Sequence, residues 1–228
     1  MGIAENIAQV RLKIARAARR SGRDPREITL VAVSKTVGLE TVAEAMAQGL
    51  THFGENRAHE LKWKQEHFPD AFWHMIGRLQ TNKVKQVVGS AVLIHSLDRW
   101  SLAEEMNKRG SLLNTPVSAL LQVSLAGEKQ KAGVLASDID QFLQSVGQLQ
   151  WLRIEGLMTM APLSEDSEKS RPIFKELCAI YRCYKRKTYQ NVDMRHLSMG
   201  MSQDFEVAIE EGATIVRVGT ALFGEHKR

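Results

Sequence analysis

The sequence predicts an α/β fold, a single (β/α)8 barrel of the TIM type with an extra N-terminal helix. Strand-like and helix-like segments alternate eight times along the 228 residues, and no linker divides them. The strand segments are short and apolar, which is typical of parallel strands that are buried on both faces. We therefore expect one domain over residues 1–228. A doubly wound open sheet is the alternative, but it usually carries a glycine-rich loop after its first strand, where this chain has Lys35.

The elements follow in chain order. Apolar residues recur at helical spacing within residues 3–20, and Ser21-Gly-Arg-Asp-Pro25 ends that pattern before the first strand. The predicted strands span residues 28–34, 51–53, 72–76, 91–95, 117–123, 152–158, 194–197 and 214–218. The helical patterns between them span residues 39–48, 56–66, 81–88, 98–109, 136–147, 166–187 and 202–211.

Composition and charge limit the partners. The 31 basic and 26 acidic residues give a net charge of +5, but they are interleaved along the chain, which argues against nucleic acid and fits a small phosphorylated ligand. Cys178 and Cys183 lie in one helical segment, poorly placed to pair, so we expect a reducing, cytoplasmic location. No apolar stretch approaches the roughly 20 residues of a membrane span, and no long apolar helix face demands a partner. We expect a monomer that does not bind membranes.

Lys35 is the first candidate for chemistry. It follows the apolar run of residues 28–34, at the carboxyl end of the first predicted strand. In a barrel this position faces the mouth, where the active site lies. Desolvation there would favour the neutral amine, which is a nucleophile suited to forming a Schiff base with an aldehyde. A surface lysine that merely follows a strand is the alternative, so the rest of the chain has to decide.

The last two strands carry a candidate phosphate site. The segment Leu197-Ser-Met-Gly-Met-Ser-Gln-Asp204 is a small flexible loop that opens a helical pattern, so its backbone N–H groups and the helix dipole favour an anion. Arg217-Val-Gly-Thr220 adds small residues and a cation. Barrels frequently bind phosphate with the loops after strands 7 and 8. Together with Lys35 across the mouth, these loops fit pyridoxal phosphate (PLP), which has an aldehyde at one end and a phosphate at the other.

Histidines do not form a predicted metal site. His52, His59, His67, His74 and His95 fall on different elements without the spacing of metal ligands. Core or rim roles are the simpler interpretation. Only His74, in the middle of a predicted strand, is a candidate for a position near the cofactor.

Several motifs occur in order along the chain: Val31-Ala-Val-Ser-Lys35, Phe53-Gly-Glu-Asn56, Trp73-His-Met-Ile-Gly77 with Leu79-Gln-Thr-Asn-Lys83, Gly156-Leu-Met-Thr-Met160, Leu197-Ser-Met-Gly-Met-Ser202 with Asp204, and Val216-Arg-Val-Gly-Thr-Ala-Leu-Phe-Gly224. They resemble those of the pyridoxal phosphate homeostasis protein family. This resemblance implies a single-domain barrel similar to the N-terminal domain of alanine racemase, with PLP held as an internal aldimine on Lys35.

The resemblance also implies the other cofactor contacts. Phosphate contacts are expected from Ser198, Met199, Gly200, Met201, Ser202, Gly219 and Thr220. Arg217 is expected to face the cofactor, at its ring nitrogen or its phosphate, with Asn56 and His74 near the ring. The chain departs from the family pattern at Arg57-Ala-His59 and at Arg78, which puts contacts at the rim in doubt.

A carrier is expected rather than an enzyme. Racemisation needs two acid/base groups on opposite faces of the cofactor, and alanine racemase takes one of them from a second domain, which we do not expect here. Arg217 at the pyridine nitrogen would also disfavour the protonated ring that carbanion chemistry uses. The resemblance implies a role in vitamin B6 and amino-acid homeostasis, with PLP-dependent apoenzymes as recipients. A weak amino-acid racemase and a Schiff-base sugar-phosphate aldolase are the alternatives.

Overall fold

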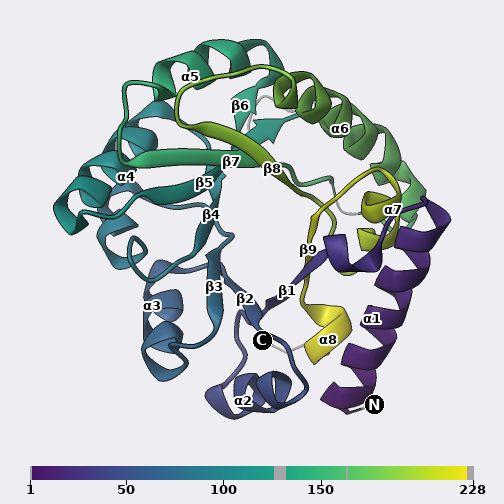
Figure 1. The fold of residues 1–228 in the computed structure, drawn as a ribbon. Coiled ribbons are helices and arrows are strands. Elements are labelled where there is room, and N and C mark those ends of the chain that lie inside the picture. Colours follow the sequence, from purple (N-terminus) through teal and green to yellow (C-terminus); the bar gives the residue numbers. More distant parts are fainter. Residues whose placement is uncertain (1, 126–131, 163, 225–228) are drawn as a thin grey trace.

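Eight parallel strands close into a barrel in the computed structural model, which describes residues 2–125, 132–162 and 164–224 (Figure 1). Going around the ring, the strands are β1, β2, β3, β4, β5, β7, β8 and β9, and β9 pairs with β1. Their bounds are Thr29–Val33, His52–Glu55, Phe72–Met75, Leu93–Leu97, Val117–Ser124, Leu152–Met158, Val192–Ser198 and Ile215–Val218. A short strand, β6 (Val134–Leu135), pairs with the end of β5 outside the ring.

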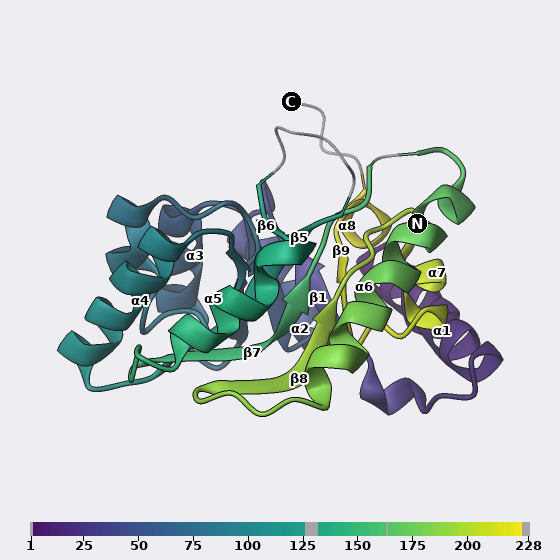
Figure 2. The ribbon, with the colours of Figure 1, turned by 90° about the horizontal axis from the view of Figure 1, so that it is seen from above.

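Helices surround the ring of strands. The α-helices α1 to α8 are Ile3–Arg20, Leu39–Ala47, Ala58–His67, Trp100–Leu113, Ile139–Val146, Arg171–Lys185, Phe205–Glu210 and Thr220–Phe223. The 3-10 helices η1 to η4 are Pro25–Glu27, Thr81–Gln86, Ala136–Asp138 and Ser167–Ser170. Figures 1 and 2 both place α1, the extra N-terminal helix, beside α7. The predicted fold class is therefore confirmed.

The eight predicted strands all occur, with ends shifted by a few residues, whereas some helices differ. The pattern at 81–88 forms only the 3-10 helix η2, in which Val84 alone is buried, so no apolar face stabilises an α-helix. The pattern at 202–211 becomes α-helical only at Phe205. The four-residue helix α8 after β9 was not predicted, because it is too short to show a period.

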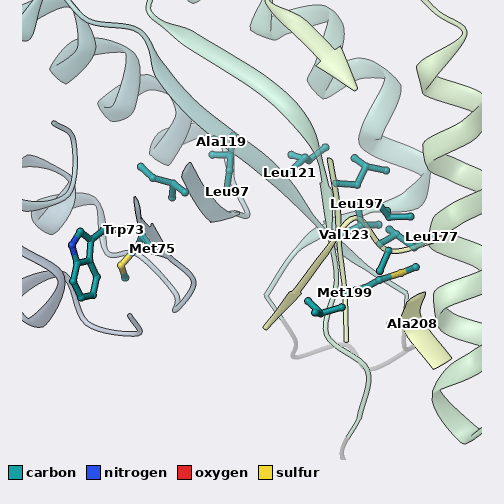
Figure 3. Close-up of a cluster of buried hydrophobic side chains, with 14 of the residues drawn as sticks. Trp73, Met75, Leu97, Ala119, Leu121, Val123, Leu177, Leu197, Met199 and Ala208 are labelled. Atoms are coloured by element: carbon teal, nitrogen blue, oxygen red, sulfur yellow. The ribbon is translucent and has the colours of Figure 1, made fainter. Parts of the chain in front are cut away.

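Apolar side chains form two layers. The larger cluster lies between the strands and the outer helices, and Figure 3 shows Leu177 of α6, Leu197 of β8 and Ala208 of α7 within it. The smaller cluster takes one buried residue from each of five strands and none from a helix, which places it inside the barrel: Val31, Leu93, Leu120, Met158 and Ile215. The barrel interior is therefore packed with side chains, as is usual for this fold.

Among the described residues, no helix is long and apolar enough to cross a membrane. Within the same residues, no three His, Cys, Asp or Glu side chains lie close enough together to hold a metal ion.

Candidate functional site

A cavity of about 400 Å³ opens at the carboxyl ends of the strands. It brings together seven of the predicted site residues: Lys35, Asn56, Met201, Ser202, Arg217, Gly219 and Thr220. Sequence reasoning did not select the other lining residues, which are Val33, Ile76, Met160, Pro162, Ser164, Gln203 and Asp204. Residues from the first strand and from the last two strands therefore face one another across this cavity.

Four predicted site residues do not line the cavity. Met199 is fully buried in the outer apolar cluster. Gly200 has φ +91°, and a Cβ there would lie 2.6 Å from Cβ of Ala208, so this glycine allows the loop to pack against α7. Ser198 and His74 are buried inside the barrel.

Lys35 lies in a turn on the rim of the barrel. The first strand ends at Val33, two residues earlier, and the Lys35 side chain is exposed. The expected desolvation of its amine is therefore absent, because Lys35 stands beyond the strand instead of pointing into the interior. Thr36, the next residue, has φ +64°, an unfavourable conformation for a β-branched side chain. Its hydroxyl bonds the Lys35 carbonyl at 2.5 Å. Backbone strain of this kind is often found at functional sites.

A buried ion pair lies beneath the turn that holds Lys35. Nζ of Lys64 donates to the backbone oxygen of Ser34 at 2.7 Å and to Oε1 of Glu55 at 2.6 Å. The Ser34 hydroxyl also donates to Oε1 of Glu55, at 2.7 Å. The network thus joins the residue before Lys35 to the residue before Asn56.

The charges of this pair are almost fully enclosed, with Lys64 2% and Glu55 0% exposed. Burial raises the pKa of the Glu55 carboxyl, and the charge of Lys64 opposes that rise. Sequence reasoning missed Lys64, although it follows the buried Leu61 by three residues on the inner face of α3. A lysine on a predicted apolar face was the signal that could have found it.

The loop after β8 and the start of α8 form the opposite wall. Oγ of Ser202 accepts from the backbone N–H of Gly219 at 3.1 Å and of Ala221 at 3.3 Å. The N–H of Met201 donates to Oδ1 of Asp204 at 2.7 Å. The helix α7 that follows this loop begins at Phe205. Ser202, Gly219 and Thr220 line the cavity.

Arg217 is a buried cation at the base of the cavity. It is 4% exposed, and its guanidinium donates to Oγ of Ser198 at 2.6 Å and to the carbonyl of Thr159 at 2.9 Å. Burial lowers the pKa of Arg217 to about 10, against a smaller opposing effect of Asp204, so it stays charged at neutral pH. No carboxylate of the described residues lies within 4.0 Å of it. The acceptors of its two hydrogen bonds are both uncharged oxygens.

A second, more open cavity of about 870 Å³ is lined by Arg57, His59 and Arg78, the residues at which the chain departs from the family pattern. It shares Asn56 with the first cavity but none of the residues on the Ser202 wall. None of these three residues lines the cavity that holds Lys35 and Arg217.

Comparisons with known proteins agree with this geometry. The family model "Alanine racemase, N-terminal domain" matches residues 6–227. The pyridoxal phosphate homeostasis protein of Aquifex aeolicus is 44% identical over 229 residues, covering 100% of both chains, and that of Escherichia coli is 37% identical, covering 97% of this chain and 96% of its own.

Solved structures lead to the same family. PipY of Synechococcus elongatus, 36% identical, has been solved without PLP and with PLP bound. Its TM-scores are 0.86 and 0.85, over 98% of this chain and 100% of the other. Alanine racemase of Corynebacterium glutamicum, 14% identical with a TM-score of 0.71 over 98% of this chain and 61% of its own, shares the fold. The resemblance in the motifs is thus confirmed, and the chain belongs to the pyridoxal phosphate homeostasis protein family.

Proposed function

We propose that this protein binds PLP as a Schiff base on Lys35 and holds it reversibly, without substantial turnover, as part of vitamin B6 and amino-acid homeostasis. The observation that carries the proposal is the cavity itself. One wall offers the amine of Lys35, and the other offers Ser202, Gly219 and Thr220 beside the buried charge of Arg217. An aldehyde at one end and a phosphate at the other match these two walls. The PLP-bound structure of PipY supports the same ligand.

The chemistry proposed for Lys35 is reversible. Its neutral amine adds to the aldehyde carbon, and loss of one water leaves a carbon–nitrogen double bond. Water reverses the reaction and frees both partners. A holder of this kind keeps the reactive aldehyde low in solution and is able to pass it to PLP-dependent apoenzymes. We propose that it works as a monomer.

The composition of the cavity supports a lack of turnover. Among the described lining residues, only Lys35, Asp204 and Arg217 carry ionisable side chains. Both carboxylate oxygens of Asp204 are occupied, by the N–H of Met201 and by the hydroxyl of Ser170 at 3.0 Å. Arg217 does not exchange protons readily. Among the described lining residues, Lys35 therefore has no free acid/base group opposite it, and racemisation needs two such groups.

Absorbance titration with PLP tests the covalent step. The wild type should develop an absorbance band at about 420 nm, which is typical of a protonated Schiff base of PLP. Lys35→Ala should lose that band. Lys62→Ala is the matched control, because Lys62 is an exposed lysine on α3 whose side chain is 53% accessible. An unchanged band in Lys35→Ala would reject the proposal.

Racemisation of free amino acids separates the carrier from its alternative. The PLP-loaded protein should interconvert alanine enantiomers no faster than free PLP does. Conversion that is clearly faster and that disappears in Lys35→Ala would establish the weak racemase instead. A protein that stays colourless with PLP but cleaves a sugar phosphate through a borohydride-trapped lysine would establish the aldolase.

A further inference from the structure

A row of three hydrogen-bonded imidazoles runs through the barrel interior to Arg217. Nδ1 of His52 lies 2.9 Å from Nε2 of His74, and Nδ1 of His74 lies 3.0 Å from Nε2 of His95. Nδ1 of His95 lies 2.9 Å from Oγ of Ser198, the atom that accepts from Arg217. We call His52, His74 and His95 the histidine row. It crosses from β2 through β3 and β4, and Ser198 connects it to β9.

We propose that His74 and His95 are positioning residues for Arg217, because the histidine row orients the Ser198 hydroxyl so that its oxygen accepts from the guanidinium. Arg217 then presents its remaining N–H groups to the cavity. Neither histidine lines that cavity. Their effect on the site passes through Ser198.

The direction of the row follows from the chemistry of its ends. Arginine only donates hydrogen bonds, so the Ser198 oxygen accepts from Arg217 and its hydroxyl proton needs an acceptor elsewhere. Among the described residues, that acceptor is Nδ1 of His95. His95 must then carry its proton on Nε2 and donate to His74, and His74 must likewise donate to His52. The reverse order would leave a buried hydroxyl proton without a partner, which is costly.

The row stays neutral near physiological pH. Burial is the main reason that the pKa of His74 falls to about 3 and that of His95 falls well below its usual value. The charges that act on the row come from Arg217 on β9 and from His196 on β8, whose own pKa is lowered by burial and raised in part by Glu155. A proton added to His95 would turn Nδ1 into a donor and break the order.

The orientation of Ser198 matters because Arg217 has no ion pair with any carboxylate in the part of the chain that the structure describes. Two neutral acceptors, Ser198 Oγ and the Thr159 carbonyl, fix the guanidinium at 2.6 and 2.9 Å. If the Ser198 proton turned toward Arg217, one of these two acceptors would be lost. The remaining N–H groups of Arg217 would then point in a different direction. This last effect, on the ligand, rests on the proposed function.

Nuclear magnetic resonance of the ligand-free protein tests the row without PLP. Long-range ¹H–¹⁵N spectra distinguish a protonated Nδ1 from a protonated Nε2 in each imidazole. His74 and His95 should both be neutral with the proton on Nε2, unchanged between about pH 8 and about pH 5, as expected for imidazoles whose pKa is depressed by burial. A proton on Nδ1 of His95, or its titration in that range, would overturn the proposal whatever the protein binds.

Variants of His95 test the effect on Arg217 and on PLP. Asparagine places a polar group near the position of Nδ1, whereas leucine removes it. His95→Leu and Ser198→Ala should shift the Nε–H signal of Arg217 and weaken PLP binding by about tenfold or more, the usual effect of disturbing a hydrogen bond to a charged group. His95→Asn should restore both to within about threefold. The double variant His95→Leu/Ser198→Ala should be no worse than either single variant.

The controls separate positioning from simple destabilisation. His67→Leu changes an exposed histidine on α3 and should alter neither signal nor affinity. Equal loss of affinity in His95→Asn and His95→Leu, with the Arg217 signal unmoved, would show a merely structural role and reject the proposal. Failure of the wild type to bind PLP would reject the proposed function alone, since the tautomers and the Arg217 signal are measured without ligand.

Discussion

Two lysines in this barrel show how position decides what a side chain does. Lys35 is exposed on a strained turn at the rim, where an amine can meet a ligand. Lys64 is enclosed with Glu55, and its three donors have two acceptors among the described residues, so its role is to fix the backbone beneath Lys35. The sequence predicts the first from its place after a strand. The burial of Lys64 depends on which face of α3 packs inward. The spacing of apolar residues in the sequence only suggests that face.

Removing the charge of Lys64 should destabilise the fold strongly. Lys64→Met leaves the buried carboxylate of Glu55 without its counter-charge, and we expect a loss of about 3 to 5 kcal/mol in the free energy of unfolding. Urea unfolding measures it. Lys62→Met, on the exposed side of the same helix, should cost no more than about 0.5 kcal/mol.

The double variant Glu55→Leu/Lys64→Met distinguishes charge from packing. Because it removes both members of the pair, it should recover most of the stability that Lys64→Met loses. A double variant that is as unstable as the single one would show that packing around Lys64, and not its charge, supports the turn.

At the scale of elements, α1 supports the wall that is proposed to hold phosphate. Nδ2 of Asn6 donates to the carbonyl of Leu222 in α8 at 3.0 Å, and Nε of Arg20 pairs with Oε1 of Glu210 in α7 at 2.7 Å. The helix thus bridges the two short helices that follow β8 and β9. Its own apolar stripe was predictable from spacing. The pattern at 202–211 predicted a helix where α7 lies, but not its contact with α1, and α8 is too short to show a period.

The buried side chain of Ile7 should stabilise the packing of α1 against the rest of the barrel. It is 2% exposed on the inner face of α1, and Ile7→Ala should lower the free energy of unfolding by about 2 to 5 kcal/mol through the cavity it leaves. Leu12, 43% exposed on the same helix, is the control, and Leu12→Ala should change stability by no more than about 0.5 kcal/mol. Thermal and urea unfolding compare the two. Equal effects would mean that α1 packs through a different face.

At the scale of the molecule, the pattern of strands was enough to predict the barrel, and the barrel places Lys35 opposite Arg217. The positions of individual site residues were harder to predict from the sequence. His74 was expected near the cofactor because it lies in the middle of a strand, yet it faces inward and bonds His52 and His95. Inside a barrel, contacts join strands that are distant in sequence, so a single strand cannot reveal them. The same reason hid the role of Ser198 as a partner of Arg217.

The buried histidines should make the whole fold sensitive to acid. The pKa of His74 is lowered to about 3, and that of His95 also falls, whereas the unfolded chain binds these protons near its ordinary value of about 6.5. Stability is therefore fully present above about pH 6.5 and is lost as pH falls, for His74 down to about pH 3. Within that window, each histidine should lower the free energy of unfolding by about 1.4 kcal/mol for each unit that the pH falls.

Urea unfolding between about pH 7 and about pH 4 measures this slope, which spans the window expected from linkage. His74→Gln should reduce the slope by the share of one histidine, whatever its stability at pH 7. His67→Gln, an exposed histidine, should leave it unchanged. The same slope in His74→Gln and in the wild type would show that His74 takes up its proton without unfolding.

Borohydride reduction followed by peptide mapping shows whether Lys35 forms the covalent bond to PLP. Reduction fixes a Schiff base as a stable secondary amine, and mass spectrometry then locates the modified lysine. We expect one phosphopyridoxyl group, on the peptide that contains Lys35. A modification at any other lysine, or none in a protein saturated with PLP, would contradict this expectation.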